Sequence, residues 1–113
     1  MKFNLLTILL FKLIIFSLSL NADEIDIVSD NIKIIENGKI IKSIKTKATI
    51  KKKGVYIEGD YSEYNKEAEI IKLEKNVLFE DRTKKITVET ENAKYNQKLD
   101  ILETTGSTNI KIE

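Results

Sequence analysis

Carboxylates are the residues of this sequence whose chemistry could support catalysis. A dense group of them lies near the middle of the chain, at Glu58, Asp60, Glu63, Glu67 and Glu69. Two carboxylates at a suitable separation can act as acid and base on a glycosidic bond. These carboxylates, however, occupy turns or the polar positions of alternating segments, so they predict a solvated surface. Histidine and cysteine are absent, which removes the common nucleophile and base arrangements. We therefore expect no enzymatic activity and no catalytic residue.

Metal ions and cofactors are not indicated either. A calcium ion would require several oxygen ligands that converge on one point. The residues around Asp60 and Asp81 do not have the spacing of such a loop. We expect neither a metal site nor a cofactor.

The N-terminal segment, residues 1–22, differs from the rest of the chain. It holds a basic residue near the start, an apolar run from Leu5 to Leu20 that Lys12 interrupts, and Ala22. This order is typical of a secretory signal peptide, with cleavage after Ala22. The uninterrupted run is shorter than the roughly 20 residues that span a bilayer. We predict an exported domain over residues 23–113, with an uncleaved membrane anchor as the alternative.

The charge of the remaining domain is close to zero. Removal of the N-terminal segment takes two lysines and no acid, which leaves 17 − 18 = −1. Such a chain has no net basic field for nucleic acid. The run Lys51–Lys53 lies beside Gly54 and is interpreted as a solvated turn. We expect no nucleic-acid partner.

Apolar residues alternate with polar ones along much of the domain, for example over 55–61, 86–90 and 108–112. Alternation with a period of two predicts strands with one buried and one solvated face. Proline is absent, and β-branched residues, which favour strands, are frequent. Further turns are expected at 74–76 and 105–107. The pattern predicts an all-β fold of short antiparallel strands.

A repeat is visible in this pattern. The dipeptide Tyr64-Asn65 returns later in the chain as Tyr95-Asn96, and the same shift places Phe79 on Ile110 (95 − 64 = 110 − 79 = 31). A weaker copy over 25–50 fits with a one-residue slip. We predict about three units of strand, turn, strand and turn, which must stack to bury their apolar faces.

These strands and turns resemble the LptA/OstA-like family of periplasmic lipopolysaccharide-transport proteins, which includes the N-terminal domain of LptD. The resemblance lies in IEGDYSEYNKEAEIIKLEKNVLFED and ITVETENAKYNQKLDILETTGSTNIKI, with IDIVSDNIKII near the start. It departs from the Gly-Asn-Val turn of the family at Lys75 and Thr108. The stretch that follows the N-terminal segment is also short for a family domain. The chain is therefore a minimal member, a truncated product, or a piece that completes its roll with another chain.

The resemblance implies an OstA-like β-jellyroll, an open roll whose apolar interior binds the acyl chains of lipid A. It also implies sheet edges that join other Lpt components, or further copies, into a bridge across the periplasm. The interior is either such a groove or an ordinary packed core. The residues expected to line it are Val55, Ile57, Tyr61, Ile71, Leu73, Val77, Phe79, Ile86, Val88, Ile101 and Ile110.

The last alternating segment is expected to be an uncovered strand. Its residues Thr108, Ile110 and Ile112 would then offer an edge for pairing with another chain, the alternative being a frayed terminus. Two functions remain open. The chain is a lipopolysaccharide-binding module, or a structural adaptor that pairs sheet edges without lipid. An LptC-like role would follow if the N-terminal segment stayed as a membrane anchor.

Overall fold

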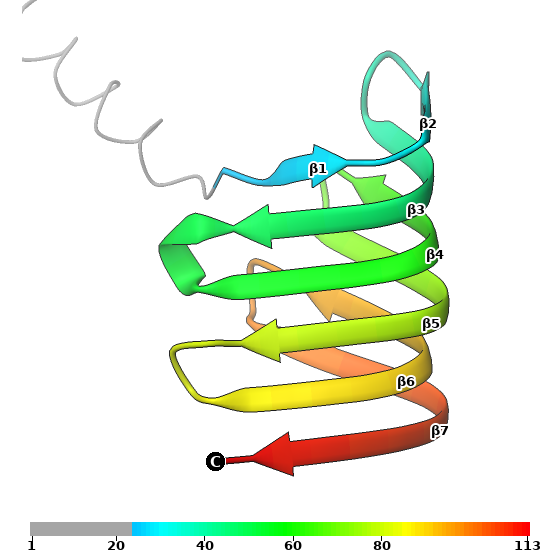
Figure 1. Ribbon diagram of the computed structural model, residues 1–113. Helices are drawn as coiled ribbons and strands as arrows, with labels where there is room; N and C mark the ends of the chain where they lie inside the picture. The colour runs from blue at the N-terminus through cyan, green and yellow to red at the C-terminus, as the bar shows by residue number, and fades with distance from the viewer. Residues whose placement is uncertain (1–23) are drawn as a thin grey trace, which may run out of the picture.

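The computed structural model describes residues 24–113, so the predicted signal peptide and its cleavage site lie outside the described part. These residues form one seven-stranded antiparallel sheet, stacked from β1 and β2 at one end to β7 at the other (Figure 1). The predicted all-β open roll is confirmed. The elements are β1 (Asp26–Val28), β2 (Asn31–Ile35), β3 (Ile40–Ile50), the 3₁₀ helix η1 (Lys51–Lys53), β4 (Val55–Asn65), β5 (Ile70–Asp81), β6 (Ile86–Asn96) and β7 (Ile101–Ile112).

The sheet is a meander of six rows. Strands β3 to β6 each pair with the next strand along the chain. The first row consists of two short strands, because β1 pairs with residues 47–49 of β3 and β2 pairs with residues 40–44. A hairpin meander of this kind needs no crossover connection, which agrees with the short turns between its strands.

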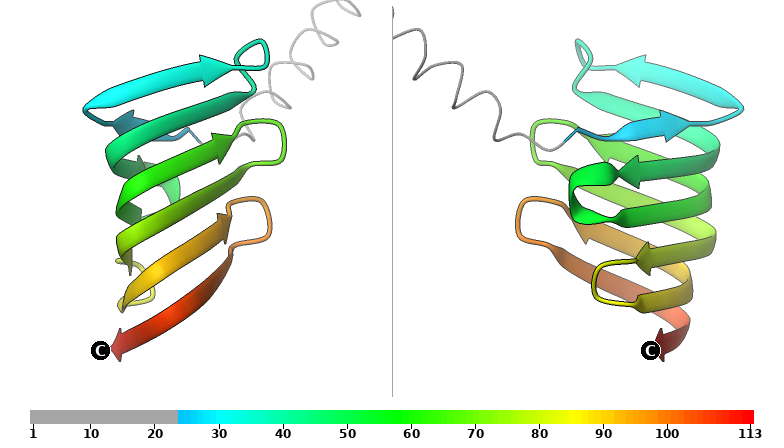
Figure 2. Two further views of the ribbon diagram at one scale, coloured as in Figure 1. Left: turned by 90° about the vertical axis from the view of Figure 1, so that its right-hand side faces the viewer. Right: turned by 60° about the vertical axis from the view of Figure 1, so that its left-hand side comes forward.

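The long strands bend near their middle, which folds the sheet into two facing leaves (Figure 2). The bends coincide with positive backbone φ angles at Lys45 in β3, at Lys75 and Asn76 in β5, and at Gly106 in β7. The pairing register also shifts at the bends of β4, β5 and β6. The first leaf comprises β1 with residues 46–50, 55–59, 77–81, 86–90 and 108–112; the second comprises β2 with residues 40–44, 61–65, 70–74, 92–96 and 101–105.

The turns predicted at 74–76 and 105–107 are wrong as chain reversals. Both segments lie inside continuous strands, β5 and β7. A left-handed residue in a paired strand produces a bulge, which redirects the strand without ending its ladder. Residues such as Asn76 and Gly106 adopt this conformation readily. The same residue types therefore occur both in chain-reversing turns and in bends within a strand.

The repeated unit is confirmed. Asn65 and Asn96 each open a turn between two strands, and each uses its Oδ1 as the acceptor. The Ala68 N–H donates to Asn65 and the Leu99 N–H donates to Asn96, both at 3.0 Å. An Asx side chain that accepts from its own turn is a common stabiliser of tight turns. The Tyr-Asn dipeptides therefore mark equivalent turns of successive units.

The one-residue slip of the first unit has a structural cause. The bend of β3 contains one positive-φ residue, Lys45, whereas that of β5 contains two, Lys75 and Asn76. Residues before the bend consequently match at a shift of 30, as Ile41 does with Ile71 (71 − 41 = 30). Residues after the bend match at 31.

The hydrophobic core lies between the two leaves and receives side chains from both. Phe79 of the first leaf contacts Tyr95 of the second, with 5.2 Å between their ring centroids. Tilted rings at such a distance form a favourable aromatic pair. The buried cluster consists of Ile50, Val55, Ile57, Tyr64, Ile71, Leu73, Val77, Phe79, Val88, Ala93 and Tyr95.

Candidate functional site

Most of the residues predicted to share an interior do so. Val55, Ile57, Ile71, Leu73, Val77, Phe79 and Val88 all belong to the buried cluster between the leaves. Ile86 is partly buried and packs against it. Between the ends of the roll the interior is thus filled by its own side chains. The binding of lipid by these residues stays a prediction.

Tyr61 and Ile101 were wrongly placed in the interior. They are 48% and 47% exposed. Tyr61 pairs with Glu74, which is exposed. The alternation counted from Val55 changes side at the bend before Tyr61, so that Ser62 and Tyr64 face inward instead.

The interior residue next to Ile101 is Leu102, which pairs with Tyr95 and packs against the core. The repeat could have identified it, because Leu102 is the equivalent of the buried Ile71 (102 − 71 = 31). Tyr64 and Tyr95 are also buried, although neither was predicted to lie in the interior. Their recurrence at the spacing of the repeat could have indicated this shared position.

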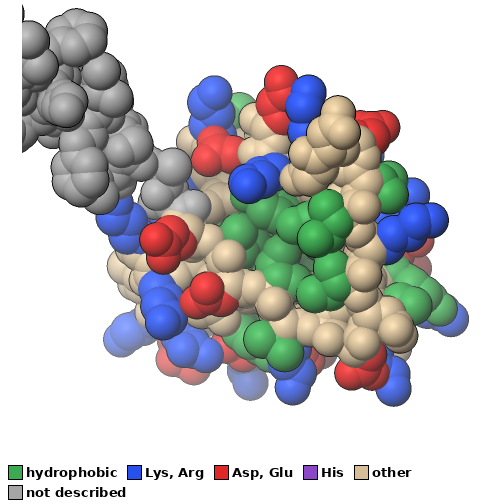
Figure 3. Space-filling view, turned by 90° about the horizontal axis from the view of Figure 1, so that it is seen from above, with side chains coloured by type: hydrophobic (Ala, Val, Ile, Leu, Met, Phe, Trp, Pro, Cys, Tyr) green, Lys and Arg blue, Asp and Glu red, His purple; other side chains and the backbone are tan. Residues whose placement is uncertain are grey.

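The apolar row of the interior continues to both ends of the roll, where it becomes exposed. At the β7 end, Ile110 pairs with the buried Val88, yet it is 63% exposed. At the other end, Ile34 of β2 pairs with Ile41 and is 62% exposed. Directly paired residues project on the same side of a sheet, so both isoleucines belong to the interior face. Figure 3 shows hydrophobic side chains in the centre of the β1 and β2 end, surrounded by backbone and charged side chains.

A buried cluster of hydroxyl groups lies at the bend between the leaves. The Ser43 Oγ is 2.8 Å from the Thr46 Oγ1 and 2.6 Å from the Ser62 Oγ, and the latter two oxygens are 2.9 Å apart. The three hydroxyls satisfy one another, which removes the penalty of burying them. None of these contacts supplies a base, so the arrangement does not activate a serine nucleophile.

On the side opposite the bends, the roll is closed where the turns of the two leaves meet; we call this line of contact the seam. There the Lys84 Nζ donates to the Asp100 Oδ2 at 2.8 Å, and the Tyr95 hydroxyl donates to the Asp100 Oδ1 at 2.6 Å. Further along, the Lys53 Nζ donates to the Gln97 carbonyl oxygen. The seam thus joins residues 53 and 84 of the first leaf's turns to residues 97 and 100 of the second leaf's turn.

The seam contact also alters the titration of its groups. The hydrogen bond from Lys84, followed by that from Tyr95, lowers the pKa of Asp100, and the same Asp100 contact raises the pKa of Lys84. A carboxylate with a lowered pKa in the folded state stabilises the fold above its unfolded pKa. That stabilisation is lost as the pH falls through the lowered pKa of Asp100.

Comparison with known proteins finds similarity to a solved structure. No family model matches the sequence, and no curated protein matches it. The chain is similar to the crystal structure of LptH, the LptA homologous periplasmic component of the conserved lipopolysaccharide transport device from Pseudomonas aeruginosa. The match covers 80% of this chain and 96% of that chain, with a TM-score of 0.44 and 9% identity.

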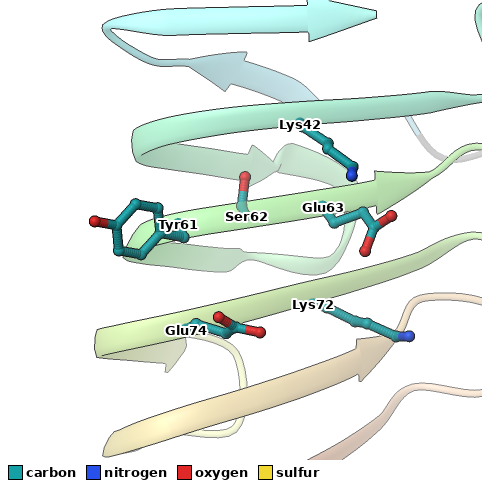
Figure 4. Close-up of a pocket in the computed structure, with 6 residues that line it drawn as sticks. All are labelled: Lys42, Tyr61, Ser62, Glu63, Lys72 and Glu74. Carbon is teal, nitrogen blue, oxygen red and sulfur yellow. The ribbon is translucent and has the colours of Figure 1, made fainter. Parts of the chain in front are cut away.

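A cavity of about 230 Å³ lies outside the interior, beside Tyr61. Figure 4 shows the side chains that line it, from β3, β4 and β5. Lys42, Glu63 and Lys72 are paired in register across these strands, so opposite charges alternate. The charges in such a row compensate one another, and the cavity is interpreted as part of a solvated outer face.

Two further findings concern possible metal and membrane contacts. Within residues 24–113, no group of three or more acidic, histidine or cysteine side chains is placed to hold a metal ion. Over the same part of the chain, no helix is long and apolar enough to cross a membrane.

Replacing Tyr95 by phenylalanine should test the seam contact. The change removes the hydroxyl that donates to Asp100 but keeps the ring against Phe79. A hydrogen bond to a charged group contributes about 1.5–3 kcal/mol, so we expect the free energy of unfolding to fall by about that amount. Urea denaturation measures it. Tyr61→Phe, on the exposed outer face, is the control, and an equal effect of the two changes would contradict a specific role for the Tyr95 hydroxyl.

Proposed function

We propose that this chain is a periplasmic module that shields the acyl chains of lipopolysaccharide in its apolar interior. The observation that carries the proposal is the interior apolar row, which emerges exposed at both ends of the roll, at Ile34 and at Ile110. Burying a methylene group on such a surface is worth roughly 0.8 kcal/mol, so a few contacts with an acyl chain give useful affinity. The nature of the lipid follows from the resemblance of the sequence to the LptA/OstA-like family.

The filled middle of the roll constrains how a lipid would bind. Ile57 is fully buried and Phe79 nearly so. An acyl chain would therefore contact the exposed residues at the ends first. It would reach the middle only when the two leaves separate, because close-packed protein interiors have no spare volume for an added chain.

We further propose that the ends join copies of the chain, or a related partner, into a continuous sheet. Among the described residues, β7 pairs on one side only, and so does the row formed by β1 and β2. Strand direction alternates from row to row, and the number of rows is even. The β1 and β2 row of a second copy would thus run antiparallel to β7, which is the arrangement within the sheet itself.

The repeat suggests a register for this joint. Within the chain, Asp26 of β1 faces Thr49 of β3, and Lys33 of β2 faces Lys42 of β3. Two units later, the equivalents of Thr49 and Lys42 on β7 are Lys111 and Glu103 (49 + 62 = 111; 42 + 61 = 103). In the same register at the joint, Asp26 would face Lys111 and Lys33 would face Glu103. Both pairs are of opposite charge, whereas within the chain Lys33 faces another lysine.

A photo-cross-linking residue at Ile110 tests lipid binding. We expect it to capture added lipopolysaccharide, because Ile110 is exposed and lies on the interior face. The same group at Asn109, the neighbour on the outer face, is the matched control. A second pair, Ile34 and Lys33, tests the other end. Equal capture by inward and outward positions would contradict the groove. Ile57 is unsuitable for such a group, because a bulky residue there would disrupt the core.

The filled interior supports a second candidate, an adaptor that pairs sheet edges and carries no lipid. In that case the inward positions would capture no lipopolysaccharide, while the chain would still associate through β7. Self-association without lipid capture would therefore favour the adaptor.

A further inference from the structure

The seam contains a set of residues that the repeat carries twice. Lys84, Tyr95 and Asp100 in one unit correspond to Lys53, Tyr64 and Glu69 in the unit before it. Each pair has the spacing of the repeat (84 − 53 = 95 − 64 = 100 − 69 = 31). A lysine on a turn of the first leaf thus recurs together with a tyrosine and an acid on the second leaf.

The two sets differ in their contacts. In the later set the lysine and the tyrosine both donate to the acid, Asp100. In the earlier set Lys53 reaches along the seam to the carbonyl oxygen of Gln97. Both lysines consequently hold the same turn, residues 97–100, against the first leaf. At this turn the second leaf is joined to the first on the side opposite the bends.

We propose that Lys84, Tyr95 and Asp100 form a latch on the side of the roll, and that its opening admits a long-chain amphiphile laterally between the leaves. The proposal rests on the lipid-carrier function above. It supplies the separation of the leaves that a filled interior requires. The ends of the roll would then remain available for joints between copies.

The position of Tyr95 connects the latch to the interior. Its hydroxyl contacts Asp100, its ring packs against Phe79 of the opposite leaf, and the residue as a whole is 1% exposed. Movement of the 97–100 turn away from Lys84 would therefore withdraw the aromatic contact between the leaves. An apolar passage to Phe79 would open at that point.

The strength of the latch suits reversible opening. The Lys84 side chain is 57% exposed, and that of Asp100 is 37% exposed. Ion pairs in contact with water are weak and screened by salt. Gly106, with a φ of +91°, lies at the bend of β7. This bend connects the 97–100 turn to the remainder of the sheet through β7 and is a suitable hinge.

Cross-linking the latch tests the proposal directly. The chain has no cysteine, so Lys84→Cys with Asp100→Cys creates a unique thiol pair, which a reducible thiol-specific cross-linker would join. The readout is the rate at which a fluorescent long-chain fatty acid is taken up by the purified protein. We expect cross-linking to slow uptake at least about ten-fold, equivalent to ~1.4 kcal/mol in the barrier, and reduction to restore it.

A matched control cross-links turns along one leaf instead of across the seam. Lys39 and Glu67 form an ion pair of 3.4 Å, and both lie on turns of the second leaf. Cross-linking Lys39→Cys with Glu67→Cys should leave the uptake rate unchanged. In a second comparison, Asp100→Asn should speed uptake several-fold, whereas the exposed outer-face change Glu89→Gln should not.

The outcomes separate the latch from the carrier function. Uptake that is equally fast before and after cross-linking of the latch would overturn the latch and leave the carrier function standing, with admission at the ends. Equal slowing of uptake by the latch cross-link and by the control cross-link would also overturn the latch, because the effect would then come from a general stiffening of the protein. Absence of uptake by the wild-type chain and by every reduced variant would overturn the carrier function, and the latch with it.

Discussion

Replacing Phe79 by alanine is expected to lower the free energy of unfolding by about 3–5 kcal/mol. Phe79 is buried in the first leaf, and its ring lies 5.2 Å from that of Tyr95 in the second. Removal of the ring leaves a cavity between two leaves that are joined through the bends of several strands. The surroundings can collapse only partly, and the lost contacts are not replaced. Urea denaturation followed by circular dichroism measures the change.

The adjacent residue on the same strand supplies the control. Leu78 pairs with Glu58 and Glu89, and it therefore lies on the outer face of the sheet. Leu78→Ala should cost less than about 1 kcal/mol, as surface changes usually do. Similar losses for the two variants would contradict the division of β5 into an inward and an outward face.

The strands and the repeat could be predicted because both are local patterns. Alternation in a strand has a period of two, and it correctly assigned Ile57 and Val88 to one face. The shift that carries one Tyr-Asn dipeptide onto the other kept this register across units. It also identified equivalent turns at Asn65 and Asn96, whose side chains make the same hydrogen bond.

The bends could not be distinguished from turns by residue type. Lys75 and Asn76 adopt positive φ inside a continuous strand, and the same residues would suit a hairpin turn. The error has a consequence for the site, because each bend changes which residues face inward. Tyr61 was misassigned for this reason, although the alternation on either side of the bend was interpreted correctly.

The seam and the hydroxyl cluster depend on contacts between distant segments. Ser43 meets Ser62 because β3 and β4 are adjacent and bend at the same level. Lys53 and Gln97 lie in different units and meet because the leaves face each other. The alternation of residues within a single strand cannot indicate either of these contacts. The repetition of lysine, tyrosine and acid at the spacing of the repeat was present in the sequence, but its meaning depends on the fold.

Reversing two charges on β7 is expected to weaken head-to-tail association about 30-fold, or ~2 kcal/mol. The variant carries Glu103→Lys and Lys111→Glu. In the register proposed above, these changes place like charges opposite Lys33 and Asp26 of the next copy. Both positions are exposed, so the single chain should lose little stability; its main cost is the like-charge pair that Glu103→Lys forms with Lys94. Sedimentation equilibrium at low salt measures the association, and added salt should reduce the difference.

Compensating changes at the other end should restore the joint. Asp26→Lys and Lys33→Glu reverse the charges of the first row, and Lys33→Glu also removes a like-charge contact with Lys42. A chain with all four substitutions should associate as the wild type does, whereas either double variant alone should not. Mixing the two double variants should restore association with the two chains in alternation, because the reversed β7 meets the reversed first row and the unchanged β7 meets the unchanged first row. As a control, exchanging the charges of Lys39 and Glu67, which pair at 3.4 Å on the turns, should leave association unchanged. Unaltered association of the β7 variant would rule out this register, and a failure of the four-fold variant to recover would show that the charges act by a route other than the joint.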